Sequence, residues 1–426
     1  MPTSAEWAGA LRSPGGEARF SPLYLSNSEG KTERAVNALG CFESIFGARS
    51  NLRLFSSPGR CEISGNHTDH QHGRVLAAAM NIDILAVVSA NNSGIIRIHS
   101  QGHGQSEVDT TLLNRLDDER GNTNSLIRGV TARMKELGYK TGGFDAYITS
   151  DVLVGSGLSS SAAFETLICT VLAELYNDGE PDPVKRAQIS RYAENEYFGK
   201  PCGLMDQTAC ACGGFVAMDF SNPENQVVEK IPFNFAGSGF TLCVVNTGGS
   251  HAELTEDYAS VPAEMSAVAE EFGKKFLREV DETLFYKRLP LLRGRLSDRA
   301  VLRAIHFFRD NERVHAQTEA LREGNFDRFL RLVNESGRSS FMYLQNVYST
   351  NDVNRQGLSV ALAVAERVLG ARGAFRVHGG GFAGTVQAFV PDDLLSGFTC
   401  AMESVFGAGS MLALYVREAG SIEIII

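Results

Sequence analysis

The glycine- and serine-rich segment GSGLSSSAA, residues 155–163, places the strictest local demands on the fold. The preceding stretch 144–150 (FDAYITS) alternates in polarity, which is typical of a half-buried strand. After the segment, Ala163, Leu167 and Val171 recur at helical spacing. A turn between a strand and a helix start presents unpaired backbone N–H groups, which favour a bound anion. The alternative interpretation is a flexible turn that only caps the helix.

The sequence of this segment excludes two common phosphate-binding motifs. A P-loop requires a lysine after its second glycine, and the segment contains no lysine. A Rossmann fingerprint requires a third glycine at the position where Ser160 stands. If the segment binds phosphate, it therefore belongs to another class of loop.

Strand and helix patterns are mixed along the whole chain, which predicts an α+β fold. The β-rich runs 84–90 and 95–99 flank the turn residues 91–94, and this arrangement predicts a β-hairpin. The other expected elements are helices near 35–48, 122–137, 184–198, 256–280 and 298–336, and strands near 52–55, 241–246, 385–390 and 412–416.

The domain organisation is predicted from local composition. The first 34 residues are rich in Ser, Gly and Pro and are interpreted as an N-terminal extension on the surface. The polar stretch 222–225 (NPEN) is the expected boundary between two domains. The predicted divisions are therefore 1–34, 35–224 and 225–426.

Charge and hydropathy narrow the classes of partner. The net charge is −10 without a basic run, which argues against non-specific nucleic-acid binding. No stretch approaches the roughly 20 apolar residues that cross a bilayer, and the N-terminus lacks the layout of a signal peptide. We therefore expect a cytoplasmic protein with no nucleic-acid or membrane partner, and a monomer or weak homo-oligomer. The eight cysteines fit no common zinc spacing.

Two segments in the first half carry ionisable groups at turns. Arg60 follows a Pro-Gly pair, and residues 65–73 (GNHTDHQHG) contain three histidines and an aspartate. Such a turn suits a metal site, a hydrogen-bonded polar loop or a sugar site, and the residues alone leave these open. In 202–207 (CGLMDQ), Asp206 lies among apolar neighbours and either caps a helix or serves as a functional carboxylate.

A third segment, 377–384 (VHGGGFAG), holds four glycines ahead of a strand pattern. Glycines at this density indicate close approach of backbone, positive φ angles or a bulged loop. Each of these motifs is weak alone, but their combination and order resemble the GHMP small-molecule kinases, and within them the galactokinase branch. The resemblance runs from about residue 36 to the C-terminus.

This resemblance implies a two-domain GHMP kinase fold with the active site in the cleft between the domains. It also implies a sugar 1-kinase that uses ATP and Mg²⁺, with galactose as the expected sugar. The expected catalytic residues are Asp206, which would accept or orient the anomeric hydroxyl proton, and Arg60, which would keep that carboxylate ionised. The expected Mg²⁺ ligands are Ser161 and Glu194.

The remaining site residues are also carried over by resemblance. The sugar would be bound by Asn66, His67, Thr68, Asp69 and Tyr258. The ATP phosphates would be wrapped by Gly155, Ser156, Gly157, Leu158, Ser159, Ser160 and Ser161, with Ser100 near the nucleotide.

The chain departs from the galactokinase pattern in the sugar loop. The family glutamate before the His-Thr-Asp triplet is Asn66 here, the tyrosine after it is His70, and the preceding Asn-Leu-Ile run is Glu62-Ile63-Ser64. Loss of that negative charge suggests a substrate with a carboxylate at C6, such as galacturonate, paired by His70, His72 or Arg74. The simpler interpretation is that Asn66 keeps the contact with galactose. Two further alternatives are a non-catalytic ATP- and sugar-binding sensor and a metal hydrolase.

Overall fold

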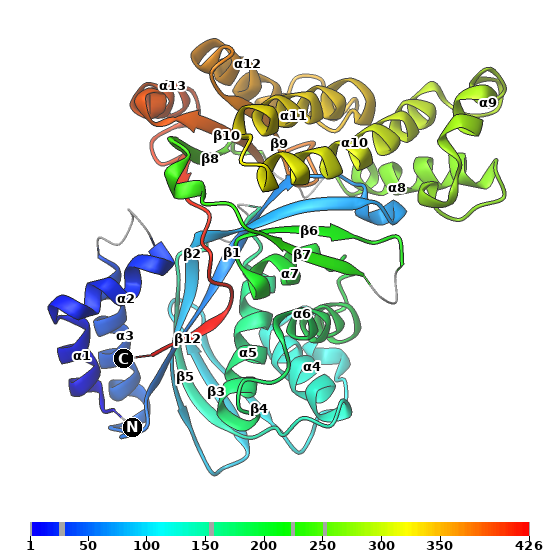
Figure 1. Cartoon of the computed structure of the whole chain (residues 1–426). Coiled ribbons are helices and arrows are strands. Elements are labelled where there is room, and N and C mark those ends of the chain that lie inside the picture. Colours follow the sequence, from blue (N-terminus) through cyan, green and yellow to red (C-terminus); the bar gives the residue numbers. More distant parts are fainter. Residues whose placement is uncertain (1, 25–29, 153–156, 223–225, 250–253, 426) are drawn as a thin grey trace.

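The computed structural model describes residues 2–24, 30–152, 157–222, 226–249 and 254–425. The chain forms two lobes, each built on its own sheet (Figure 1). No helix in these ranges is long and apolar enough to span a bilayer.

The lower lobe in Figure 1 contains an eight-stranded sheet with the order β12-β1-β2-β5-β3-β4, and β6 and β7 continue from β2. Its strands are β1 (Arg53–Ser64), β2 (Arg74–Ala90), β3 (Ile95–Ser100), β4 (Gly104–Asp109), β5 (Phe144–Ser150), β6 (Phe215–Asp219), β7 (Val227–Ile231) and β12 (Ile422–Ile424). The helices are α1 (Ser4–Leu11), α2 (Pro14–Tyr24), α3 (Lys31–Phe46), α4 (Thr123–Glu136), α5 (Ser160–Tyr176), α6 (Pro183–Tyr192) and α7 (Met205–Cys212). A π-helical turn (Ala193–Phe198) continues α6.

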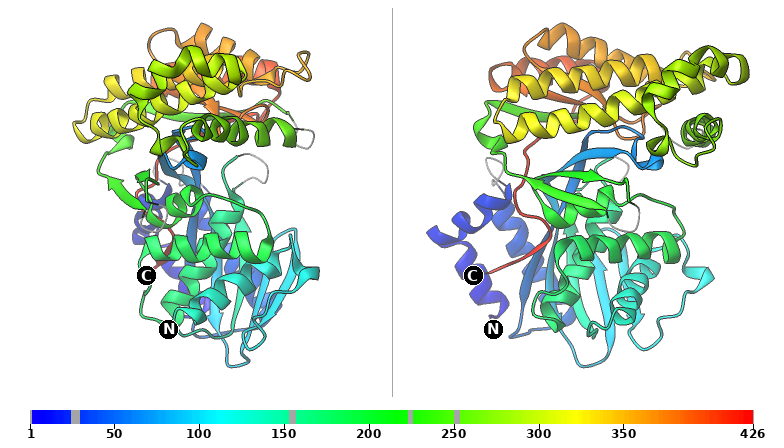
Figure 2. Two further views of the ribbon diagram at one scale, coloured as in Figure 1. Left: turned by 90° about the vertical axis from the view of Figure 1, so that its right-hand side faces the viewer. Right: turned by 45° about the vertical axis from the view of Figure 1, so that its right-hand side comes forward.

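Helices cover both faces of this sheet, as Figures 1 and 2 show. Along β1 and β2, Leu54 and Leu85 pack with α1–α3, whereas their neighbours Phe55 and Ala86 pack into the core with α4 and α5. Successive side chains of a strand point to opposite faces, so a strand covered on both sides is apolar at nearly every position. This accounts for the continuous burial of β2.

The upper lobe holds a four-stranded sheet with the order β11-β8-β10-β9. The strands are β8 (Phe240–Asn246), β9 (Ala374–His378), β10 (Thr385–Pro391) and β11 (Met411–Leu414). The helices are α8 (Thr255–Glu270), α9 (Glu282–Arg295), α10 (Asp298–Arg322), α11 (Phe326–Ser339), α12 (Gly357–Leu369) and α13 (Leu395–Phe406). After β11 the chain returns to the lower lobe, where β12 pairs antiparallel with β1.

Mixed helix and sheet agree with the predicted α+β class, but the predicted hairpin is wrong. β5 lies between β2 and β3, antiparallel to the first and parallel to the second. The turn residues 91–94 therefore connect strands that are not neighbours. A strand from about 50 residues later occupies the position that local pairing would have filled, because it buries an apolar face on each side.

Two long helical predictions also require correction. The region 298–336 is two helices, because Gly324 adopts φ +66° and the Asn325 side chain caps the N–H of Arg328 in α11. The region 256–280 ends its helix at Glu270, shortly before Gly273 at φ +66°. Positive φ favours glycine and ends a right-handed helix.

The predicted domain limits stay predictions, and strand pairing adds two facts about them. β7 pairs with β6, so residues 227–231 belong to the lower sheet although they follow the predicted boundary. The predicted extension, 1–34, contains α1 and α2, with Trp7, Leu11 and Phe20 buried against α3.

Candidate active site

The candidate phosphate loop connects β5 to α5. Gly155 and Ser156 lie outside the described residues. Ser159 precedes α5 with φ +56°, and its side chain does not cap the helix, so the first-turn N–H groups have no side-chain cap. The carbonyl of Leu158 accepts a hydrogen bond from the backbone N–H of Arg60 at 3.1 Å. The loop is therefore joined to β1 next to the candidate catalytic arginine.

Arg60 and Asp206 form a bidentate ion pair, with Nε–Oδ1 at 2.7 Å and Nη2–Oδ2 at 2.6 Å. Arg60 lies where β1 shifts register against β2, and Asp206 lies in the first turn of α7. The Ser159 hydroxyl also donates to Oδ2, and Arg60 donates to the Gly157 carbonyl. Charge-assisted, forked contacts of this kind are strong and fix orientation.

The electrostatics of this pair set the charge of Asp206. Burial alone would raise the pKa of its carboxyl, but the charge and hydrogen bonds of Arg60, with the Ser159 hydroxyl, lower that pKa below its usual value. Burial alone would lower the pKa of the Arg60 guanidinium, but the charge and hydrogen bonds of Asp206 outweigh burial, so that pKa is raised. Both groups are therefore ionised at neutral pH.

The candidate metal ligands lie in an adjacent cluster. The Ser161 hydroxyl donates to Oε1 of Glu194 at 3.1 Å, and Nζ of Lys200 lies 3.0 Å from the same oxygen. Gln207, next to Asp206, donates from Nε2 to Oε2 of Glu194 at 2.8 Å. Ser161 and Glu194 both carry oxygen donors, the ligand chemistry that Mg²⁺ prefers, and their side chains are in hydrogen-bond contact.

Glu165, Lys200 and Gln207 were not identified from the sequence. Gln207 also donates to Glu165 at 3.2 Å, and burial together with the charge of Glu194 raises the pKa of Glu165 well above its usual value. A signal was available, because Glu165 stands four residues after Ser161 on an otherwise apolar helix face. An isolated carboxyl in such a position is a candidate functional or supporting group.

The sugar-loop residues occupy the junction of the two lobes. The Asn66 amide donates to Oε1 of Glu62 at 2.8 Å and to the Gly379 carbonyl at 2.5 Å, and its oxygen accepts from Asn346 at 2.5 Å. Asn66 is fully buried, so its amide is committed to protein partners. The galactokinase pattern has asparagine at the first of these two positions and glutamate at the second, whereas this chain has Glu62 and Asn66. The two side chains hydrogen-bond to each other.

His67, Thr68 and Asp69 have distinct surroundings. His67 Nε2 lies 2.9 Å from the Gly380 carbonyl, and burial followed by nearby His70 lowers the pKa of His67 to about 4, so the ring is neutral. Thr68 donates to the carbonyls of Gly65 and Arg74 and thereby closes the loop. Asp69 is the sugar-loop candidate that lines an open hollow.

This hollow, of about 280 Å³, lies in the lower lobe beside the segment that leads into α7. It is lined by Asp69, His70, His72, Arg191, Pro201, Cys202, Gly203, Leu204, Phe220 and Gln226. Arg74, a predicted partner for a sugar carboxylate, instead pairs with Asp219 and Glu312.

Tyr258 and Ser100 complete the predicted set. The Tyr258 hydroxyl donates to the Gly381 carbonyl at 2.6 Å, and its ring would lie 2.4 Å from a Cβ at Gly380, so only glycine fits there. Ser100 ends β3, which runs parallel to β5, so it lies at the same end of the sheet as the phosphate loop.

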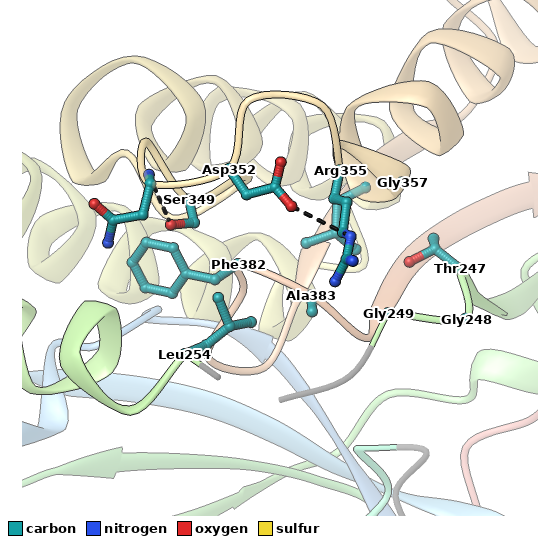
Figure 3. Close-up of a pocket in the computed structure, with 12 residues that line it drawn as sticks. Thr247, Gly248, Gly249, Leu254, Ser349, Asp352, Arg355, Gly357, Phe382 and Ala383 are labelled. Atoms are coloured by element: carbon teal, nitrogen blue, oxygen red, sulfur yellow. Dashed lines mark hydrogen bonds and ion pairs between the residues drawn. The ribbon is translucent and has the colours of Figure 1, made fainter. Parts of the chain in front are cut away.

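A larger hollow of about 440 Å³ opens on the upper lobe (Figure 3). It is lined by Thr247, Gly248, Gly249, Leu254, Ser349, Asn351, Asp352, Arg355, Gly357, Leu358, Phe382 and Ala383. Figure 3 shows Phe382 and Ala383, which follow the glycine triplet, facing the loop that carries Asp352 and Arg355. The predicted catalytic residues do not line it.

The metal hypothesis for the histidine-rich loop is not supported. Within the residues that the structure describes, no group of three or more His, Cys, Asp or Glu side chains is arranged to hold a metal ion. His72 stacks on Phe276 with ring centroids 3.7 Å apart, while His67 faces the Gly380 carbonyl. His67 and His72 therefore have different partners.

Replacing Asn66 with aspartate is expected to destabilise the protein by about 3 kcal/mol, because a carboxylate oxygen would replace the N–H donor between Glu62 and the Gly379 carbonyl. Burial already raises the pKa of Glu62, and a second carboxylate raises it further, so the loss grows as pH increases. Denaturant unfolding at pH 5.5 and 8 measures the free energy of unfolding of wild type and variant. The control is Asn354→Asp, at an exposed position. Equal stability of Asn66→Asp and wild type at pH 8 would contradict the committed amide.

On the predicted role of Asp69 in sugar binding, replacing Gly203 with alanine is expected to raise the sugar KM about tenfold, because the new Cβ would lie 2.8 Å from Oδ2 of Asp69 and would displace that carboxylate. The KM for ATP should change less than twofold. Steady-state kinetics with each substrate varied measures the split, and Gly40→Ala, where no atom lies within 4 Å of the new Cβ, is the control. An unchanged sugar KM would show that Asp69 does not bind the sugar.

Comparison with known proteins gives a consistent result. Residues 125–214 match the GHMP kinases N terminal domain, and residues 40–90 match the galactokinase galactose-binding signature. A galactokinase from Streptomyces coelicolor is 30% identical over 380 residues, which cover 89% of this chain and 94% of that protein. A galactokinase from Pyrococcus furiosus is 33% identical over 341 residues, which cover 79% of this chain and 88% of that protein.

Solved structures share the fold. The structure of Lactococcus lactis galactokinase complexed with galactose aligns with a TM-score of 0.77 at 24% identity, covering 91% of this chain and 99% of that one. A mevalonate kinase structure aligns with a TM-score of 0.60 at 14% identity, covering 86% and 99%. At these identities the alignments support the architecture alone.

Proposed function

Because this chain belongs to the galactokinase family of the GHMP kinases, we propose that it transfers the terminal phosphoryl group of ATP to the anomeric hydroxyl of galactose. The single observation that carries the proposal is the bidentate pair of Arg60 and Asp206 beside the serine-rich loop. A carboxylate held ionised next to a phosphate-loop candidate suits the activation of a hydroxyl nucleophile.

Asp206 would orient the sugar hydroxyl and accept its proton as the bond to phosphorus forms. Arg60 keeps that carboxylate ionised and contributes positive charge toward the transferred group. The uncapped first turn of α5 would donate backbone hydrogen bonds to phosphate oxygens, and its dipole favours their charge. Phosphoryl transfer depends mainly on positioning and charge stabilisation, which these groups supply.

Ser161 and Glu194 would hold Mg²⁺, since both present oxygen donors from neighbouring elements. When bound, Mg²⁺ neutralises negative charge on the phosphates of ATP. Lys200 also contacts Oε1 of Glu194 and Gln207 donates to Oε2, so both help to orient the Glu194 carboxylate. In this proposal, Asp69, His67 and Tyr258 line the sugar side, whereas Thr68 and Asn66 support the loop from behind.

The Asn66 amide is hydrogen-bonded to protein partners, which supports galactose as the substrate over a sugar that carries a carboxylate at C6. The notion of a uronate substrate rested on Asn66 facing the sugar, but its amide is bonded to Glu62 and Gly379. The intact Arg60–Asp206 pair also argues against a non-catalytic sensor.

The test is ADP release with Mg-ATP and a panel of galactose, galacturonate, N-acetylgalactosamine, glucose and arabinose. We expect turnover of galactose, and loss of that turnover in Asp206→Asn. Turnover of galacturonate without galactose would replace the substrate but keep the mechanism. Equilibrium binding of ATP with no turnover of any sugar would favour the sensor.

A further inference from the structure

A cluster of charged side chains lies between the N-terminal helices and the sheet. Arg34 of α3 donates to Oδ1 of Asp83 at 2.7 Å and to Oδ2 of Asp151 at 2.6 Å. It also donates to the carbonyls of Asp83 and Thr149, at 3.1 and 2.8 Å. Lys31, one turn earlier on α3, contacts the same oxygen of Asp151. Two cations of one helix therefore converge on one carboxylate.

Asp151 occupies a particular place in the chain. It directly follows β5 and precedes the candidate phosphate loop, and its backbone N–H donates to the Asp83 carbonyl at 2.9 Å. Val152, the next residue, packs against Gly59, because a Cβ there would lie 3.3 Å from its methyl groups. On the far side of the loop, the Leu158 carbonyl accepts from Arg60. The described residues on either side of 153–156 are thus held in place, Asp151 by charge and a backbone hydrogen bond and Leu158 by backbone pairing.

The two carboxylates differ in their dependence on α3. Asp83 is fully buried and has other partners, since the Tyr24 hydroxyl donates to it at 2.7 Å and Arg417 lies 3.4 Å away. Asp151 is about one third exposed, and it forms ion pairs with Lys31 and Arg34. Loss of Asp151 therefore removes the link to the loop and leaves the buried pair of Asp83 in place.

We infer that Lys31 and Arg34 are positioning residues for nucleotide binding: without touching ATP, they hold Asp151, at which the chain leaves β5 toward the phosphate loop. This inference rests on the proposed function, because it assumes that the loop binds ATP. It assigns to the N-terminal helical segment a role in setting the affinity for ATP. A loop whose flanking residues are held in place loses less conformational freedom when it binds phosphate.

The test compares Asp151→Ala and Lys31→Met with wild type in two assays, steady-state kinetics and direct equilibrium titration with Mg-ATP in the absence of sugar. We expect each variant to weaken ATP affinity about tenfold and to change the sugar KM less than twofold. The double variant should be no weaker than Asp151→Ala alone, because both substitutions break one contact. The control is Glu33→Gln on the same helix, which breaks only the exposed pair with Arg12.

The outcomes separate this inference from the proposed function. ATP affinity within twofold of wild type in Asp151→Ala would overturn the inference even if the enzyme turns over galactose. Equal losses in both KM values, with a matching fall in Tm, would also overturn it, because they indicate general destabilisation. If no sugar is phosphorylated, the equilibrium titration still reports on the loop, so failure of the proposed function leaves the inference measurable.

Discussion

Asp206→Asn is expected to lower kcat about a thousandfold, because the neutral amide cannot accept the hydroxyl proton and proton transfer to a positioned group contributes roughly 10²- to 10⁴-fold. The asparagine oxygen can still accept from Arg60, so the loop geometry should persist. The KM values for ATP and sugar should change by less than about threefold, because the interaction is made mainly in the transition state. Initial-rate kinetics with quantified ADP measures both.

Two controls make the Asp206 result interpretable. Loss of one partner of a buried ion pair costs stability, about 3 kcal/mol, so thermal unfolding must show that the variant is folded at the assay temperature. Cys212→Ser, on the same helix, should retain wild-type kcat. A loss in kcat smaller than tenfold, with the variant folded, would rule out Asp206 as the catalytic base.

Arg60→Gln is expected to move the acid limb of the pH–rate profile to higher pH and to lower kcat about a hundredfold. In the wild type, the influence of Arg60 outweighs burial and keeps the pKa of Asp206 below its usual value, so activity that needs the carboxylate is lost only when pH falls through that low pKa. Without Arg60, burial raises the pKa, and the same loss occurs at higher pH. Profiles of kcat/KM between about pH 5 and pH 9 measure the shift.

Arg60→Lys is the matched variant for this profile. Lysine keeps the positive charge but cannot form the forked contact, so kcat should fall while the acid limb stays close to that of the wild type. An Arg60→Gln enzyme whose acid limb is unmoved would show that Arg60 does not hold the charge of Asp206.

The local polarity pattern was sufficient to predict a helix or strand where that element is defined by its own residues. The strand 144–150 was predicted with its exact limits from its own residues, but six of its seven residues are buried, so it is covered on both faces and not half-buried as its alternation indicated. The hairpin prediction was wrong because strand order is decided by a partner far along the chain, which local turn residues do not report. Helices α1 and α2 were missed for a related reason, since their burial depends on α3 and on a sheet made later in the sequence.

The candidate site divides in the same way. The residue types at Arg60 and Asp206 were recognisable from motif, but their ion pair joins positions 146 residues apart and exists only in the fold. The direction of the Asn66 side chain could not be predicted, because it is set by Glu62, Gly379 and Asn346 from both lobes. Glu165 interrupts the apolar face of α5, but helical periodicity reports only which face is buried and not what a carboxyl on that face contacts.

The position of β12 has a consequence for how the protein is made. Residues 422–424 emerge from the ribosome after the whole upper lobe, yet they pair with β1 near the start of the chain. Until then, β1 presents unpaired N–H and C=O groups along one edge, which is a template for unwanted strand pairing. The nascent lower lobe therefore cannot complete its sheet until the upper lobe has been synthesised, and until then the open edge of β1 is exposed to unwanted pairing.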